Sequence, residues 1–304
     1  MNFKWFLYSI FLFSGFMYGQ ERFKDSIFSE ISVKTYPYAT KDSTILEFDF
    51  YHANKDTLTK RPLFVFVHGG GFSSGKKDHP EIIKLAKQIA SRGYVVASVS
   101  YRLTRRGKSF GCNCPSEEKI ATFQDAGEDI MDAVLFMLAR TKLFQIDNEK
   151  IILSGSSAGA EGILNLTYNK DLLFRDQKQY DSFKPAAVVS LAGAILDQRY
   201  ITKENVVPGI FFHGTADPLV PYASGAHHYC KKDQIGYLML DGSASIVSKL
   251  EKLEESFLFY SFVDANHDVF KIPFKRLQEI LSFMHKVVIN RKFHQAKITV
   301  NKGE

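Results

Sequence analysis

The chain alternates short apolar runs with amphipathic stretches, and this alternation restricts its possible folds more than any other feature. Residues 63–67 read LFVFV, and residues 94–100 read YVVASVS. Continuous apolar runs of this length are typical of parallel strands that are buried on both faces. Between them, residues 79–91 place isoleucine, leucine and alanine at helical spacing. Strands that alternate with amphipathic helices predict an α/β fold with a mostly parallel central sheet and helices on both faces.

The same alternation extends along the rest of the chain. Two β-branched and aromatic segments, residues 31–38 and 44–51, predict an opening antiparallel strand pair. Further strands are expected at residues 151–154, 186–191, 209–212 and, as the last strand, 257–262. Further helices are expected at residues 124–143, from residue 158 onward, at 246–255 and at 273–292, the last with proline in its first turn. Ligands bind such sheets at the carboxyl ends of the strands.

Composition narrows the class of protein. With 304 residues, 45% of them hydrophobic and 24% charged, the chain can bury a core without a metal or a disulfide framework. Disordered and collagen-like chains are excluded. Because there is no repeat, low-complexity tract or linker, we expect one domain over residues 20–304. The net charge is +6, but the basic residues are scattered, which argues against a nucleic-acid partner.

The first 19 residues have the pattern of a secretory signal peptide. Lys4 supplies the positive charge, an uncharged apolar stretch follows, and Gly19 is a small residue at which cleavage can occur. The stretch is too short for a stable membrane span, and no apolar run of 18 residues follows it. We therefore predict a periplasmic or secreted protein with no stable membrane insertion after cleavage. An uncleaved N-terminal anchor is the alternative.

Export would place the three cysteines in a compartment where a disulfide can form. In an oxidising compartment, Cys230 can form a bridge with either Cys112 or Cys114, and the third thiol then stays free. A metal site needs four ligands at suitable spacing, and the nearby His227 and His228 with a C-x-C pair make only a weak zinc pattern. We expect no metal and no cofactor.

The first motif that carries chemistry is HGGGF at residues 68–72, directly after the LFVFV strand. Successive glycines let the backbone turn with unusual dihedral angles and approach a ligand closely. Their N–H groups can then stabilise a negatively charged oxygen that develops during a reaction. Taken alone, the motif could also be an ordinary glycine-rich turn.

The second motif is GSSAG at residues 155–159, which follows the strand at 151–154 and opens a helix. A strand, a sharp turn and a helix form the setting that a GxSxG nucleophile elbow requires. Such a turn exposes the hydroxyl of its central serine at the sheet edge. Ser157 is therefore the candidate nucleophile, whereas Ser156 is its neighbour.

Two further strand ends supply an acid and a base. Asp217 follows the strand at 209–212 in HGTADPLVP, and His267 follows the strand at 257–262 in DANHD. An imidazole can take the proton from a serine hydroxyl and return it to a leaving group. A carboxylate fixes the tautomer of that imidazole. Asp217 alone would be a turn residue, but the order Ser157, Asp217, His267 is that of an α/β-hydrolase triad.

Together these motifs resemble those of α/β-hydrolase fold serine esterases, in particular the hormone-sensitive-lipase-like and bacterial feruloyl/acetyl esterase group. The resemblance covers about residues 30–290 and includes SYRL at residues 100–103. It implies that the backbone amides of Gly70, Gly71 and Ala158 form the oxyanion hole.

The resemblance also suggests which residues meet the substrate. The motif residues His68, Phe72 and Tyr101 are candidate substrate-binding residues. Residues 103–118 are, with Phe72, candidate pocket walls, and residues 222–241 are a candidate partial lid. The lipase-like branch usually has aspartate before the nucleophile, whereas this chain has Ser156. Its large N-terminal cap helices have no counterpart here, so we expect no large cap domain and do not assign the chain to that branch.

The implied activity is that of a serine carboxylic-ester hydrolase acting through an acyl-enzyme. By analogy, its substrates are short-acyl esters or acetyl and feruloyl esters carried by a polysaccharide. A prolyl-oligopeptidase-like serine peptidase is one alternative, although such enzymes normally carry a propeller domain or a longer N-terminal region. A non-catalytic binding protein on a hydrolase fold is another, although such proteins typically lose the nucleophile, the histidine or the oxyanion glycines.

Overall fold

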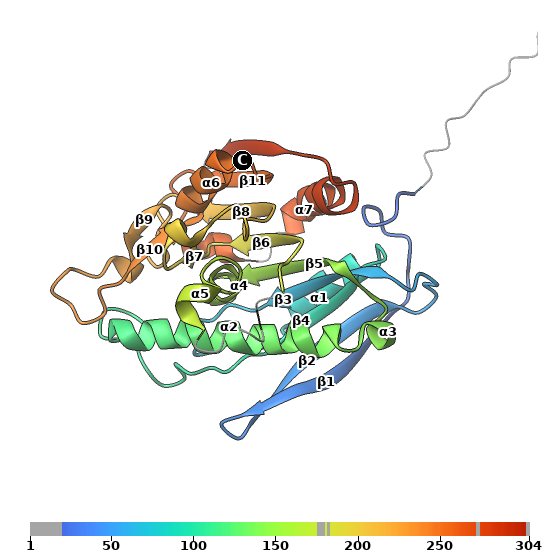
Figure 1. The fold of residues 1–304 in the computed structure, drawn as a ribbon, viewed down its shortest axis with the longest axis horizontal. Coiled ribbons are helices and arrows are strands. Elements are labelled where there is room, and N and C mark those ends of the chain that lie inside the picture. The colour runs from blue at the N-terminus through green and yellow to red at the C-terminus, as the bar shows by residue number, and fades with distance from the viewer. Residues whose placement is uncertain (1–19, 175–179, 181–182, 272–273, 302–304) are drawn as a thin grey trace, which may run out of the picture.

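A nine-stranded sheet forms the centre of the computed structural model, which describes residues 20–174, 180, 183–271 and 274–301 (Figure 1). The predicted signal peptide at residues 1–19 lies outside the described residues. The strands of this sheet are β1 (Ile31–Lys41), β2 (Thr44–Ala53), β3 (Arg61–Val67), β4 (Val95–Val99), β5 (Ile146–Ser156), β6 (Ala187–Leu191), β8 (Gly209–Gly214), β11 (Phe257–Phe262) and β12 (Gln295–Val300).

The strand order is β1-β2-β4-β3-β5-β6-β8-β11-β12. The pairs β1–β2 and β2–β4 are antiparallel, and every pair from β4 to β12 is parallel. The predicted mostly parallel sheet with an opening antiparallel pair is confirmed. Because the parallel strands all end at the same edge, the motifs that follow β3, β5, β8 and β11 are gathered there.

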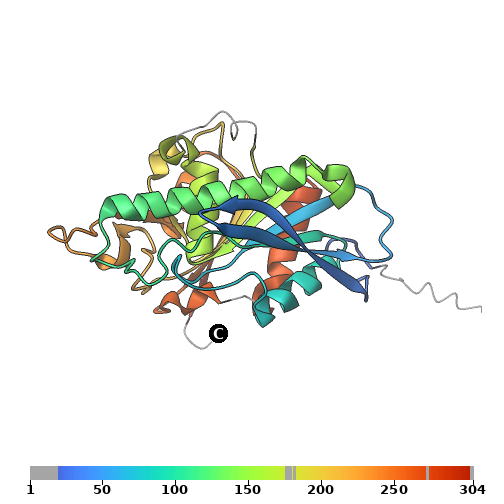
Figure 2. The same ribbon diagram turned by 90° about the horizontal axis from the view of Figure 1, so that it is seen from below.

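Helices cover both faces of the sheet, as predicted (Figures 1 and 2). The helices are α1 (Pro80–Ala90), α2 (Ser116–Leu138), α3 (Thr141–Phe144), α4 (Ala158–Tyr168), α5 (Lys170–Leu173), α6 (Ser243–Lys252) and α7 (Leu277–Met284). Apolar residues of α2, α4 and α6 share one buried cluster with one face of the sheet. Those of α1 and α7 share a second cluster with the other face.

A small antiparallel sheet, order β7-β10-β9, lies beyond the carboxyl ends of the main strands and was not predicted. It consists of β7 (Ala194–Ile195), β9 (Ser224–Ala226) and β10 (Met239–Gly242). In the described part of the chain, the strand ends are bordered by this sheet and by the irregular segment between β4 and α2, with no helical cap among them. No helix in the described ranges is long and apolar enough to cross a membrane.

Three sequence predictions about helices and strands differ from the structure. The helix expected at 124–143 begins at Ser116 and ends at Leu138, with the short α3 after it. The closing helix consists of a 3-10 turn (Phe274–Arg276), α7 and a π-helical turn (His285–Ile289), so it ends before the predicted residue 292. The proline expected in its first turn, at position 273, lies outside the described residues. Residues 257–262 are not the last strand, because β12 pairs in parallel with β11. This edge strand is largely exposed and shows little apolar signal in the sequence.

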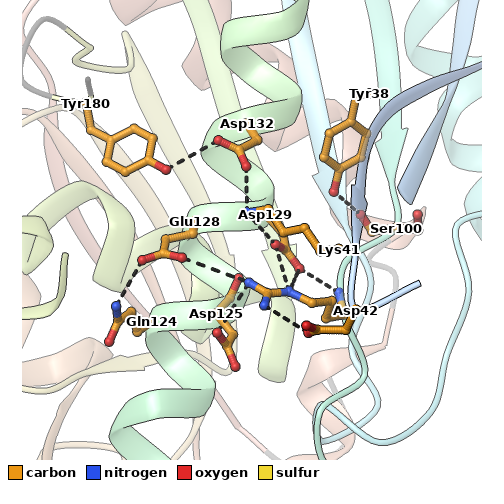
Figure 3. Close-up of polar contacts among 11 residues, drawn as sticks. Tyr38, Lys41, Asp42, Ser100, Gln124, Asp125, Glu128, Asp129, Asp132 and Tyr180 are labelled. Atoms are coloured by element: carbon orange, nitrogen blue, oxygen red, sulfur yellow. Dashed lines mark hydrogen bonds and ion pairs between the residues drawn. The ribbon is translucent and has the colours of Figure 1, made fainter. Parts of the chain in front are cut away.

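A buried carboxylate anchors the opening hairpin and the SYRL segment to α2 (Figure 3). Asp129 is fully buried and accepts hydrogen bonds from the backbone N–H and the Nε of Arg102, at 2.8 and 2.9 Å. Lys41 at the end of β1 reaches the same carboxylate at 3.1 Å and Asp132 at 2.6 Å. A buried charge is costly unless it is paired in this way. The network therefore fixes the position of the residues that follow β4, including Tyr101.

Candidate active site

Ser157 occupies the sharp turn between β5 and α4, with φ 51° and ψ −123°. Residues other than glycine rarely adopt this conformation, and such strain is concentrated at functional sites. The flanking glycines are required by packing. A Cβ at Gly155 would lie 2.3 Å from the carbonyl oxygen of Gly159, and a Cβ at Gly159 would lie 2.3 Å from that of Val67. The spacing of the GSSAG motif thus follows from the tightness of the turn.

The structure brings the three predicted triad residues together. Ser157 Oγ lies 2.8 Å from His267 Nε2, and His267 Nδ1 lies 2.7 Å from Asp217 Oδ2. The other carboxylate oxygen of Asp217 accepts hydrogen bonds from the backbone N–H groups of Leu219 and Val220, at 2.9 and 3.0 Å. In this arrangement the imidazole can accept the serine proton while its Nδ1–H stays bound to the carboxylate.

Asp217 remains charged although its side chain is buried. Burial opposes the charge, but hydrogen bonds from His213 and His267 outweigh it, so the pKa of Asp217 lies below its usual range. His213 is itself fully buried and contacts the Ser243 hydroxyl at 2.8 Å through Nδ1. The carboxylate is therefore available to orient His267 at neutral pH.

Adjacent strands hold the acid loop against the histidine loop. β8 and β11 pair in parallel, and the N–H of Ala216 donates to the carbonyl oxygen of Ala265 at 3.0 Å. A Cβ at Gly214 would lie 2.3 Å from that same oxygen. The HGTADP motif therefore has glycine at this position because the histidine loop passes directly over it.

The glycine run after β3 packs directly on the elbow. Gly70 and Gly71 have φ of 117° and 59°, and the Gly70 carbonyl accepts hydrogen bonds from the N–H groups of Ser73 and Ser74, at 3.1 and 3.0 Å. A Cβ at Gly69 would lie 3.2 Å from the Cβ of Ser157. Gly70, Gly71 and Ser157 line one cavity, so the predicted amide donors lie beside the serine that they would serve.

The predicted contacts of Phe72 and Tyr101 with substrate need correction, whereas His68 lines a neighbouring cavity together with Gly70 and Ser156. Phe72 is fully buried, packing on Phe110 and Phe123 with ring centroids 5.0 and 5.7 Å apart. The Tyr101 hydroxyl donates to the His68 carbonyl at 2.9 Å, and the two rings stack 4.6 Å apart. None of the three lines the cavity around Ser157. Phe72 and Tyr101 lie behind the glycine run, where both side chains pack against the core.

The cavity around Ser157 has a volume of about 380 Å³. Part of its wall is apolar, and the rest carries polar side chains. The apolar residues are Phe110, Leu219, Val220 and Phe270, and the polar ones include Lys108, Glu161, His227 and His228. Residues 103–118 contribute to the wall, as the sequence predicted. Residues 222–241, predicted as a partial lid, contribute to the same wall.

A disulfide joins these two wall segments. Cys112 is bonded to Cys230, while Cys114 is a free, buried cysteine. The sequence left this pairing open. Among the described residues, no group of three or more histidine, cysteine, aspartate or glutamate side chains is arranged to hold a metal ion.

Glu161 and His227 line the cavity but were not among the predicted site residues. Both are almost completely buried. Glu161 is the one charged residue in α4 and lies four residues after Ser157, so it faces the same side of the helix. A charged residue at that spacing was a signal that sequence reasoning did not use. His227 offered no comparable signal, since its place depends on how the segment before β10 folds.

The chain is similar to known esterases. Residues 48–198 match the BD-FAE family model. Gut esterase 1 of Caenorhabditis elegans is 30% identical over 148 residues, which are 49% of this chain. The chain spans only 24% of the length of that relative.

Solved structures of Thermogutta terrifontis esterase 2 share the fold. The form phosphorylated by paraoxon has a TM-score of 0.61 at 18% identity, covering 84% of this chain and 94% of that one. The propionate-bound form has a TM-score of 0.60 at 20% identity, covering 88% and 97%. The resemblance to the α/β-hydrolase esterase group is thereby confirmed. The chain has the α/β-hydrolase fold, and residues 48–198 of it resemble the BD-FAE family.

Proposed function

We propose that this protein is a serine carboxylic-ester hydrolase that works through an acyl-enzyme. The observation that carries the proposal is the unbroken path of hydrogen bonds from Ser157 through His267 to Asp217, with lengths of 2.8 and 2.7 Å. The strained elbow and the adjacent glycine run support it, because acyl transfer needs both an exposed nucleophile and amide donors for the oxyanion.

The proposed reaction has two steps. Ser157 Oγ attacks the ester carbonyl carbon while its proton passes to His267 Nε2, and the amides of Gly70, Gly71 and Ala158 stabilise the oxyanion. The carbon–oxygen bond to the alcohol then breaks, and the alcohol leaves with the proton from His267. A water molecule, deprotonated by His267, attacks the acyl-enzyme, and its collapse releases the acid and restores Ser157. Asp217 stabilises the imidazolium at each stage.

The proposed substrates are short-acyl esters, including acetyl or feruloyl esters carried by a polysaccharide. The cavity of about 380 Å³ lies at the lower end of the range for ligand pockets, which supports small acyl groups. Forms of the Thermogutta esterase 2 with propionate and with butyrate bound lend further support.

We also propose that the protein is exported and acts in a periplasm or outside the cell. The bond between Cys112 and Cys230 supports this, because disulfides persist in oxidising compartments and are rare in the cytosol. N-terminal sequencing of the protein from the extracytoplasmic fraction should begin at Gln20. A full-length protein found only in the cytosol would contradict the proposal.

The test of function is hydrolysis of p-nitrophenyl esters from acetate to dodecanoate. We expect turnover of the short esters and labelling by a fluorophosphonate probe, both lost in Ser157→Ala by at least about a thousandfold. Ser26→Ala, a change at an exposed serine, is the matched control. A folded wild-type protein that hydrolyses no ester contradicts the proposal. Hydrolysis of peptides instead would favour a peptidase, and absence of labelling would favour a binding protein.

A further inference from the structure

Glu161 and His227 lie on the wall of the cavity that contains Ser157, yet neither takes part in the hydrogen bonds between Ser157, His267 and Asp217. Glu161 is 2% exposed and His227 is 1% exposed. The backbone N–H of Glu161 donates to the Ser157 carbonyl at 2.9 Å, so Glu161 lies one helical turn beyond the nucleophile. The two side chains come from separate elements, α4 and the turn that follows β9.

Both side chains have a buried polar atom without a hydrogen bond. These atoms are Oε1 of Glu161 and Nδ1 of His227. Glu161 Oε1 lies 3.5 Å from His227 Nε2, in a contact that does not satisfy it. Buried polar groups are nearly always paired, because an unpaired one forfeits its hydration. Two such atoms on one wall of a cavity are therefore a place for a polar ligand group.

Burial of the two side chains favours a neutral ligand group. Burial raises the pKa of Glu161 well above its usual range, Asp217 acts in the same direction, and Lys119 opposes it. Burial, with His228 and Lys119, lowers the pKa of His227 well below its usual range. The Lys119 ammonium already donates to the Gly236 carbonyl at 2.7 Å. Both shifts favour the uncharged forms of these two side chains.

We propose that Glu161 and His227 form a polar subsite that binds a hydroxyl group carried by the ester substrate. This inference rests on the proposed esterase function and names its substrate class, which is esters with a free hydroxyl rather than apolar esters of equal length. A hydroxyl both donates and accepts, so it can satisfy both unpaired atoms at once. The terminal torsion of glutamate is soft, which lets the carboxyl turn an oxygen toward the ligand.

The experiment measures a ratio of kcat/KM within matched pairs of esters. One pair places the hydroxyl in the acyl part, as p-nitrophenyl 6-hydroxyhexanoate against p-nitrophenyl hexanoate. The other pair places it in the alcohol part, as 4-hydroxybutyl acetate against butyl acetate. The ratio is measured for wild type, Glu161→Leu, Glu161→Gln and His227→Phe, with Glu117→Leu as a control at an exposed glutamate. Fluorophosphonate titration gives the concentration of active sites in each variant.

In either the acyl pair or the alcohol pair, we expect kcat/KM of wild type and of Glu117→Leu to be at least about tenfold higher for the hydroxyl ester. The reason is that a site built to bind a hydroxyl rejects the analogue that lacks it. Glu161→Leu and His227→Phe should bring the ratio to about one, and Glu161→Gln should retain part of it. If Glu161→Leu does not fold, the other two variants keep the test decisive. Wild-type turnover with equal rates in both pairs would overturn the subsite while the esterase function stands. Absence of turnover of every ester would overturn both.

Discussion

The hydroxyl of Ser156 donates a hydrogen bond of 2.6 Å to the carbonyl oxygen of Phe270. This bond ties the turn that carries Ser157 to the loop that carries His267, whose ring stacks on Phe270 with centroids 5.1 Å apart. Ser156 is the position at which the sequence departs from the lipase-like branch. In this chain the Ser156 side chain, next to the proposed nucleophile, holds the loop of the proposed base, His267, in place.

Removing this link should slow the reaction moderately. A buried hydrogen bond is worth about 0.5–1.5 kcal/mol net, so we expect Ser156→Ala to lower kcat by about two- to tenfold while Ser157 still reacts with a fluorophosphonate. Ser245→Ala, which removes a hydroxyl contact between Ser224 and Ser245 on the exposed side of α6, is the control. An unchanged kcat in Ser156→Ala would show that the bond does not position His267.

Replacing the proposed acid should cost far more. Asp217→Asn keeps the size of the side chain but no longer holds His267 in the tautomer that accepts the serine proton, so we expect kcat to fall by about 10³–10⁴-fold. Steady-state rates on p-nitrophenyl acetate, normalised by active-site titration, measure the loss. Asp268→Asn changes an exposed carboxylate in the histidine loop and serves as the control. Equal losses in both variants would contradict the assigned role.

The same carboxylate should make stability depend on pH. Because the pKa of Asp217 in the folded protein lies below its unfolded value of about 3.9, the charged form stabilises the fold above that pH. This contribution is lost as the pH falls toward the folded pKa. The difference in Tm between wild type and Asp217→Asn should therefore be largest near pH 7 and shrink below about pH 4. A difference in Tm between the two proteins that is constant from pH 3 to 7 would contradict this contribution of Asp217.

The glycine run should tolerate no side chain at Gly70. Its φ is 117°, and a Cβ there would lie 2.3 Å from the Ser74 carbonyl oxygen, so Gly70→Ala must displace the loop that holds the proposed oxyanion donors. We expect kcat to fall by about 10²–10³-fold. Gly107→Ala is the matched control, because Gly107 also has a positive φ, 73°, but nothing lies within 4 Å of its added Cβ. Similar rates for the two variants would refute this reading.

The disulfide should stabilise the fold and shape the cavity. Cys112 and Cys230 are 118 residues apart in sequence, and opening such a bridge typically costs about 2–5 kcal/mol. We expect Cys112→Ser to lower the Tm and to raise KM, because Phe110 and His228 on the two joined segments line the cavity. Cys114→Ser removes a thiol outside the bridge and is the control. A wild-type Tm that does not respond to dithiothreitol would contradict this role.

The local sequence determined the order of the main elements and the residues at their ends. The apolar runs of β3, β4 and β5 identify strands buried on both faces, and the parallel arrangement then gathers Ser157, Asp217 and His267 at one edge. Prediction succeeded here because the period of apolar residues and the conformational needs of glycine are both local properties.

Tertiary structure decided what the local pattern leaves open. The sequence shows Phe72 and Tyr101 beside a reactive motif, yet packing turns both inward against the core. It contains three cysteines, but only the approach of two distant loops selects Cys112 as the partner of Cys230. The cavity wall of Glu161 and His227 likewise forms where α4 meets the segment before β10. Burial and pairing between distant segments depend on the positions of the whole chain in space. A short stretch of sequence does not determine those positions.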